Sequence, residues 1–266
     1  TEIISNPVNF AALDGAEQPV KMRLSSLVVN VHHEGPAESA EKVQITYLND
    51  EKMHRVTADR VVMAGQQHLN KRVVTDLPES YRAAMDEFKH SPMLTVNVAL
   101  RNWKFMDNMG VASVRWFGDN MGGWFTSLRK QMVLDGEEPM PLDPEKPTVL
   151  TLYNSFCTPG LPLHEQTVAA RMHLFSLSYA DVENEIRSQF TKMFGPGGFD
   201  ADRDIAGITL NRQGHAYIVT PPGFFFGKDG NPPPSDVIRQ PHGRIAFAHS
   251  ELMGYQMWEG AAHEGE

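Results

Sequence analysis

The chain has 266 residues, of which 41% are hydrophobic and 21% charged, and its formal net charge is −9. This length and composition are typical of one large globular domain or two smaller ones. The acidic balance argues against a nucleic-acid surface, which needs clustered Lys and Arg. No apolar run approaches the roughly 20 residues of a transmembrane helix, and no signal peptide is recognised. The single cysteine, Cys157, excludes an internal disulfide and leaves the compartment open.

Three strands are predicted near the start of the chain. Residues 21–31 are rich in β-branched and apolar side chains, and apolar residues alternate over residues 43–47. A turn at Asn49-Asp50 separates these from a third strand over residues 56–64, which ends in small residues. Three strands in succession favour a β-meander.

Several histidines lie in this region, but their spacing does not indicate a metal site. His32 and His33 are adjacent on a strand and therefore point to opposite faces. Neither they nor His54 and His68 match the ligand spacing of a zinc or iron site. We therefore expect no metal.

A second region is predicted from Asn70. A helix begins at Leu77-Pro78-Glu79 and ends at Ser91-Pro92, and an alternating strand follows over residues 93–100. Residues 102–125 carry an aromatic cluster that either lines a substrate cavity or forms part of a core. A strand over residues 148–153 and a helix over residues 178–194, with a capping pattern at Ser178 and Asp181, complete the region.

A strand over residues 205–210 leads to His215 and Tyr217. Side chains at positions i and i+2 of an extended chain face the same way, so these two can act on one substrate. A neutral imidazole can accept a proton from an ammonium group while a tyrosine orients it. The alternative is a hydrogen-bonded histidine with a purely structural role in a sheet.

The C-terminal stretch combines a short strand at residues 244–248, a polar turn at His249-Ser250-Glu251 and a small-residue helix that includes Trp258, Glu259 and Gly260. A helix N-terminus that follows a strand can present free N–H groups to an anionic or carbonyl-rich ligand. The alternative is a strand, loop and helix that only pack together. The sequence contains no GxGxxG motif after a strand, which is the usual dinucleotide fingerprint.

This C-terminal stretch, GRIAFAHSE followed by MWEGAAHEGE, resembles the flavin-contacting motif of the flavin-containing amine oxidoreductases. The resemblance extends over most of the chain and is closest to the NAD(P)/FAD-binding, spermidine dehydrogenase-like branch. It implies an α+β chain with an incomplete α/β-type FAD domain of the glutathione-reductase-like class. Residues 1–66 and 240–266 would form that incomplete domain, and residues 67–239 a mixed-sheet substrate domain.

The same resemblance implies an FAD site and a partner. Contacts to FAD would come from Val28, Ala64, Gly65, Ser250, Glu251, Trp258, Glu259 and Gly260. The pyrophosphate loop would belong to an N-terminal half, supplied as a separate chain or a further segment. Three departures from the family stand out: His249 replaces a glycine, Gln213-Gly214 replaces a Trp-Pro pair, and residues 93–100 lack the usual lysine. Some members of the branch carry haem, but nothing in this sequence marks an axial ligand.

The predicted activity is hydride transfer from a polyamine-like amine to FAD. Two alternatives remain: a non-catalytic binding module that needs the N-terminal partner, and a carotenoid desaturase-like flavoprotein that acts on carbon–carbon bonds.

Overall fold

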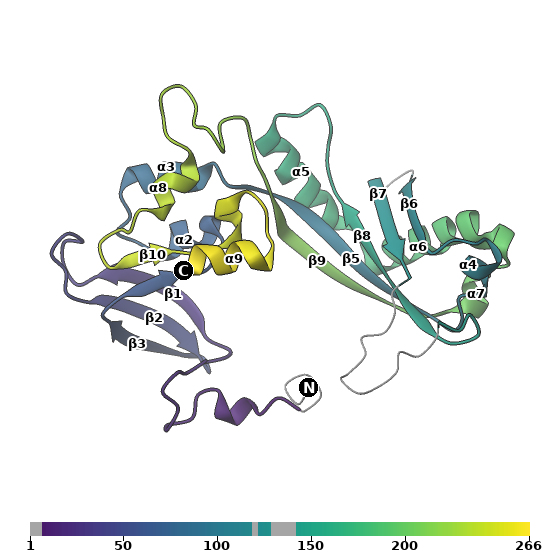
Figure 1. Ribbon diagram of the computed structural model, residues 1–266, viewed down its shortest axis with the longest axis horizontal. Coiled ribbons are helices and arrows are strands. Elements are labelled where there is room, and N and C mark those ends of the chain that lie inside the picture. Colours follow the sequence, from purple (N-terminus) through teal and green to yellow (C-terminus); the bar gives the residue numbers. More distant parts are fainter. Residues whose placement is uncertain (1–6, 119–121, 129–141) are drawn as a thin grey trace. The chain divides into compact units, whose positions relative to one another are not determined.

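The computed structural model describes residues 7–118, 122–128 and 142–266, and the chain divides into two compact units (Figure 1). The first unit comprises residues 1–89 and 218–266, and the second comprises residues 90–217. Each unit has its own hydrophobic core. The sequence-based division assigned residues 67–239 to a second domain. In the structure, residues 67–89 and 218–239 belong to the first unit. The reason is that Val74, Met85 and Ile238 are buried in the core of that unit.

A three-stranded antiparallel sheet forms one part of the first unit, with strands in the order β1 (Leu27–His33), β2 (Val43–Asn49) and β3 (Lys52–Ala58). The predicted turn is a two-residue loop, in which Asp50 and Glu51 have φ values of 47° and 61°. Two consecutive positive φ values are typical of the type I′ turn, which matches the twist of a hairpin. The predicted meander is therefore present.

The third predicted strand, over residues 56–64, is two strands in the structure. The tight turn makes β3 begin at Lys52, and Val56 pairs with Ile45 on β2. The chain then leaves this sheet, and β4 (Val61–Met63) pairs in parallel with β10 (Ile245–Phe247), near the C-terminus. The apolar pattern of residues 56–64 does not indicate that the chain passes from one sheet to another within this stretch.

Helices and short 3₁₀ segments complete the first unit. They are η1 (Phe10–Ala12), α2 (Gln67–Val73), α3 (Glu79–Asp86), α8 (Pro234–Arg239), η3 (Ser250–Met253) and α9 (Trp258–Gly265). The helix predicted to end at Ser91-Pro92 ends earlier, and the residues after it already belong to a strand.

The second unit contains a five-stranded sheet in the order β6-β7-β8-β5-β9. Its strands are β5 (Lys89–Leu100), β6 (Ser113–Gly118), β7 (Gly122–Ser127), β8 (Thr148–Ser155) and β9 (Ile205–Val219). Pairing of β5 with β8 begins at Met93, so Pro92, which has no N–H to donate, lies outside this ladder.

The helical segments of the second unit are α4 (Lys104–Asn108), α5 (Leu163–Ser176), α6 (Tyr179–Phe194), η2 (Gly195–Gly197) and α7 (Ala201–Asp204). The predicted capping box of α6 is confirmed: Asp181 N–H donates to Ser178 Oγ at 3.1 Å, and Ser178 N–H donates to Asp181 Oδ2 at 2.7 Å. Among the described residues, no helix is long and apolar enough to cross a bilayer.

The aromatic cluster of residues 102–125 contributes mainly to the core of the second unit. Trp103, Phe105, Trp116 and Trp124 are buried there, and the rings of Trp116 and Trp124 are stacked 6.1 Å apart. Phe117, by contrast, is 81% exposed. The sequence allowed either a substrate cavity or part of a core, and the structure places these four side chains in the core. Residues 119–121 lie outside the described part of the chain.

Candidate functional site

Two parallel strands bring together residues that the sequence predicts to bind a cofactor. Ile245 pairs with Val61 and Phe247 with Met63, and Ala248 N–H continues the ladder to Met63 O at 3.1 Å. Because the strands are parallel, their carboxyl ends meet at one edge. Ala64-Gly65 follows β4 there, and Ser250-Glu251 lies three residues beyond β10. Ligands of α/β folds commonly bind at this kind of edge.

A buried carboxylate holds this edge together. Glu251 is 0% exposed, and its Oε1 accepts a hydrogen bond from the backbone N–H of Gln67, at the start of α2. An acidic side chain at a helix N-terminus is favourable because the first amides of a helix lack partners within it. Glu251 therefore joins η3 to α2.

Gly65 and Gln67 add two further features to the same edge. Asn70 Nδ2 donates to Gly65 O at 2.8 Å, and a Cβ on Gly65 would lie only 2.9 Å from Asn70 Oδ1. Gln67 is fully buried, and its Nε2 has no hydrogen-bond partner among the described residues. An orphaned buried donor is uncommon and calls for an explanation. At this edge the backbone of Gly65 therefore lies close to the side chain of Asn70, beside the unpaired Nε2 of Gln67.

His249, where the resembling family usually has glycine, acts as the N-cap of η3. Its Nδ1 accepts a hydrogen bond from Glu251 N–H at 3.2 Å. Side-chain acceptors at this position satisfy amides that would otherwise lack partners. The departure from the family pattern therefore has a local structural role.

The helix α9 follows this turn. Its N-cap, Met257, offers no side-chain hydrogen bond to the first-turn amides, and Trp258 is 80% exposed. Gly260 is buried, and a Cβ there would meet Met253 Sδ at 3.4 Å.

An ion pair fixes the other end of α9. Arg239 Nη2 lies 2.5 Å from Glu264 Oε1 and 3.1 Å from Leu252 O. The hydrogen bond to Glu264 raises the pKa of Arg239, with burial acting in the opposite sense. The predicted small-residue helix is thus present, and its first turn is exposed.

Val28 belongs to the three-stranded sheet and not to the sheet of β4 and β10. It sits near the start of β1, pairs with Tyr47 and is 38% exposed. His33, at the other end of the strand, contacts the segment that leads into β10. The predicted contact of Val28 with FAD stays a prediction.

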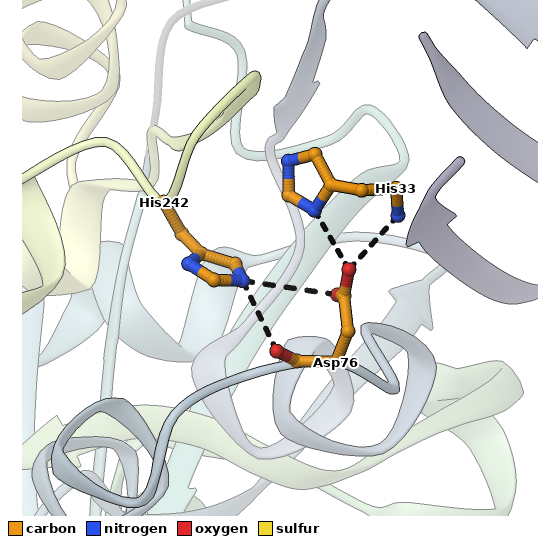
Figure 2. A group of neighbouring side chains, drawn as sticks. All are labelled: His33, Asp76 and His242. Carbon is orange, nitrogen blue, oxygen red and sulfur yellow. Dashed lines mark hydrogen bonds and ion pairs between the residues drawn. The ribbon is translucent and has the colours of Figure 1, made fainter. Parts of the chain in front are cut away.

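A cluster of His33, Asp76 and His242 also lies beside the start of β10 (Figure 2). Their ligating atoms lie within 4.8 Å of one another, so the cluster is a candidate for metal binding. However, Arg244 N–H donates to His33 Nε2 at 3.0 Å, which makes Nε2 an acceptor and requires the ring proton to be on Nδ1. A metal on Nδ1 would need the opposite tautomer. The geometry therefore favours hydrogen bonding over metal ligation.

The predicted catalytic pair lies in the second unit, on the continuous strand β9. His215 is half-buried and Tyr217 is 46% exposed, and their i, i+2 spacing on an extended strand places them on one face. The ring of His215 contacts the buried ring of His90, with centroids 5.7 Å apart. His90 was not predicted from the sequence, because its contact arises from the pairing of distant strands.

Arg171 and Phe175, both on α5, pack beside this pair. Arg171 donates to Gly214 O at 3.0 Å and to His90 O at 3.4 Å. Burial lowers the pKa of Arg171. A Cβ on Gly214 would lie 2.9 Å from the Phe175 ring. The glycine thus lets an aromatic ring from another element approach the strand, where the resembling branch has Trp-Pro in sequence.

The strand that lacks the family's lysine is tied to both of its neighbours. Asn97 Oδ1 accepts from Thr151 Oγ1 at 2.8 Å, and Asn97 Nδ2 lies 3.5 Å from Thr209 Oγ1. At this position the side chain stabilises the sheet.

Comparison with known proteins gives a fold. No family model and no curated protein sequence matches the chain. Among solved structures, cyclohexylamine oxidase from Brevibacterium oxydans IH-35A matches 90% of this chain with 45% of its own, at 18% identity and a TM-score of 0.53. Wild-type putrescine oxidase bound to putrescine matches 90% of this chain with 46% of its own, at 20% identity and a TM-score of 0.55. A putrescine oxidase variant redesigned in cofactor binding gives a TM-score of 0.56.

These identities establish a shared fold. The chain is a mixed helix and sheet protein with the architecture of part of these amine oxidases, and it spans less than half of their length. The shared fold agrees with the predicted α+β class and with the amine oxidoreductase resemblance at the level of architecture.

Proposed function

We propose that this chain is part of an FAD-dependent oxidoreductase that oxidises an amine, with a fold of the glutathione-reductase-like class. The observation that carries the proposal is the edge where β4 and β10 end. It gathers Ala64, Gly65, Ser250 and Glu251, four of the residues expected to bind FAD, from opposite ends of the sequence. The architecture shared with amine oxidases supports the same assignment.

The residues at this edge suit FAD. The unused donor of buried Gln67 and the first turn of α9, which no side chain caps, offer N–H groups to carbonyl or phosphate oxygens. Glu251 contributes by fixing η3 against α2, since its carboxylate is already bound to Gln67 N–H. Trp258 and Glu259, both exposed, would lie against the ring system.

The two parallel strands also support a partner. Parallel sheets are normally covered on both faces, and a two-stranded sheet is rarely stable alone. Here the parallel sheet has only β4 and β10 within the described residues, and Val62 is 62% exposed. We propose that an N-terminal half supplies further strands and the GxGxxG loop that would hold the pyrophosphate.

FAD would accept a hydride from the carbon–nitrogen bond. In this reaction the described chain would bind the amine and take up a proton from its ammonium group. We propose that His215 accepts a proton from the ammonium group and that Tyr217 orients it, since both lie on one face of β9. A polyamine-like substrate of the spermidine dehydrogenase-like branch fits this chemistry.

Co-expression with an N-terminal half tests the proposal. We expect the chain alone to be colourless, and the assembly to be yellow and bleached by putrescine or spermidine in the absence of an oxidant. A flavin that polyenes bleach and amines do not would support the carotenoid desaturase-like alternative. An assembly that binds no flavin would support the non-catalytic binding module and contradict the proposal.

A further inference from the structure

The ring of His33 has a bonding partner on each nitrogen, and the partners differ in kind; Figure 2 shows the one on Nδ1. Nε2 accepts from Arg244 N–H at 3.0 Å. Nδ1 lies 2.7 Å from Asp76 Oδ2, and the same carboxylate oxygen accepts from His33 N–H at 2.9 Å. A backbone amide only donates, so the neutral ring carries its proton on Nδ1. His33 thereby joins a carboxylate on one side to the turn before β10 on the other.

Each member of this cluster comes from a different segment. His33 ends β1, Asp76 lies between α2 and α3, and His242 and Arg244 flank Gly243 before β10. His242 Nε2 lies 3.1 Å from Asp76 O, so it donates to that carbonyl. The side chain of His33 is 0% exposed. Water therefore cannot readily replace a bond that His33 loses.

Few other charged groups face the cluster. Tyr81 lies 5.7 Å from His242, centroid to centroid, and donates to Gln240 O. Arg82, from α3, donates to Thr75 O at 3.1 Å. The guanidinium of Arg244 is bound to Ala40 O at 2.7 Å and to Asp59 O at 3.2 Å. Within the described part of the chain, Asp76 is the carboxylate that pairs with His33.

We propose that His33 is an acid-sensitive latch that holds the turn of residues 242–244 against β1. A second proton on the ring must go to Nε2, where it would face the N–H of Arg244. Two donors cannot share a hydrogen bond, so this contact is lost. The protonated ring stays paired with Asp76, since opposite charges favour the pair. Acid therefore opens the Arg244 side of the cluster and leaves the Asp76 side closed.

The latch sits where the return strand begins. Arg244 O accepts from Val61 N–H at 3.0 Å, which is the first bond of the parallel pair. If the proposed FAD site is correct, opening the latch would loosen the strand that leads to Ser250 and Glu251. The latch itself is a property of the chain and does not depend on that proposal.

Amide hydrogen exchange tests the latch on the 266-residue chain without any cofactor. We expect the protection factor of the Arg244 amide, corrected for intrinsic exchange, to fall between pH 7.5 and pH 5.5, by up to about tenfold per pH unit once the His33 ring takes up a second proton. The Thr75 amide, which donates to Val31 O at 3.1 Å, should keep its protection. Equal protection of Arg244 at pH 7.5 and pH 5.5, or equal losses at both amides, would overturn the proposal.

A matched pair of variants assigns the effect to one ring. His33→Gln removes the titrating group and should make Arg244 protection independent of pH. His32→Gln, at the neighbouring half-buried position, should keep the dependence. If His33→Gln does not fold, nitrogen chemical shifts of the His33 ring in the native chain decide the matter. A neutral ring protonated on Nδ1 at pH 7.5 supports the latch, and one protonated on Nε2 rules it out.

Discussion

Gln67 and Glu251, separated by 184 positions in the sequence, are joined by a hydrogen bond from a backbone amide to a buried carboxylate. Gln67 opens the helix after β4, and Glu251 lies in the turn after β10. This bond therefore couples the two loops at the edge where we propose that FAD binds.

Replacing Glu251 tests that coupling. Glu251→Ala should lower the free energy of unfolding by about 1–3 kcal/mol, because the buried N–H of Gln67 would lose its acceptor. Glu259→Ala removes an exposed carboxylate from the same segment and should change it by about 0.5 kcal/mol or less. Urea denaturation of both variants measures the difference. Equal effects would mean that the Gln67–Glu251 bond contributes no stability of its own.

Gly243 has a backbone and surroundings that exclude a side chain. Its φ is +56°, and a Cβ would lie 2.5 Å from Ala37 O and 2.7 Å from His33 Nε2. Gly243→Ala should therefore destabilise the chain by about 2 kcal/mol or more. Gly35→Ala is the control, since its φ is +107° but nothing lies within 4 Å of the added Cβ. Thermal or urea unfolding should show the larger loss at Gly243, and a larger loss at Gly35 would contradict the packing described.

Asp76 should make stability depend on pH at the acidic end. Burial acts to raise the pKa of Asp76, but hydrogen bonds from the backbone N–H and ring of His33 outweigh it and lower the pKa. A carboxyl whose pKa is lower in the folded state stabilises the fold above its unfolded pKa, about 3.9, and loses this contribution as the pH falls through the lower folded value.

The measurement compares native chain and Asp76→Asn in urea from pH 7 to pH 3. We expect the free energies of unfolding to differ by about 1–2 kcal/mol at neutral pH, a small value because the carboxylate is 29% exposed and solvent weakens its interactions. This difference should shrink below a pH of about 4. Asp107→Asn, an exposed carboxylate of α4, should show no such trend. A difference that does not shrink between pH 4 and pH 3 would contradict the lowered pKa of Asp76.

The proposed base can be tested in the assembled enzyme. His215→Asn should lower kcat/KM for the amine by about 100-fold or more at neutral pH, and the loss should shrink at alkaline pH, where the substrate is already neutral. His164→Gln, an exposed histidine of the same unit, should leave kcat/KM unchanged. An activity loss at His215 that is the same at every pH would indicate a structural role instead.

The sequence predicted those parts of the fold that depend on local pattern. The capping residues Ser178 and Asp181 define the start of α6, and the alternation of residues 93–100 matches β5. The helix α5 was not predicted, because Leu174 is the single large apolar side chain among its buried positions, beside Thr167 and Ala170.

The site was only partly predictable for a related reason. The small residues after β4 and the turn after β10 could be singled out by resemblance, but their meeting follows from parallel pairing across the whole chain. The bonds of His33 to Asp76 and Arg244 depend on segments brought together by folding, and no short-range pattern encodes them.

The location of the cofactor is the central claim, and hydrogen exchange with and without FAD tests it most directly. In the assembly with its N-terminal half, we predict that FAD slows exchange of the amides of residues 64–67, 249–251 and 258–261. Unchanged exchange in all three segments, with FAD bound, would contradict the account.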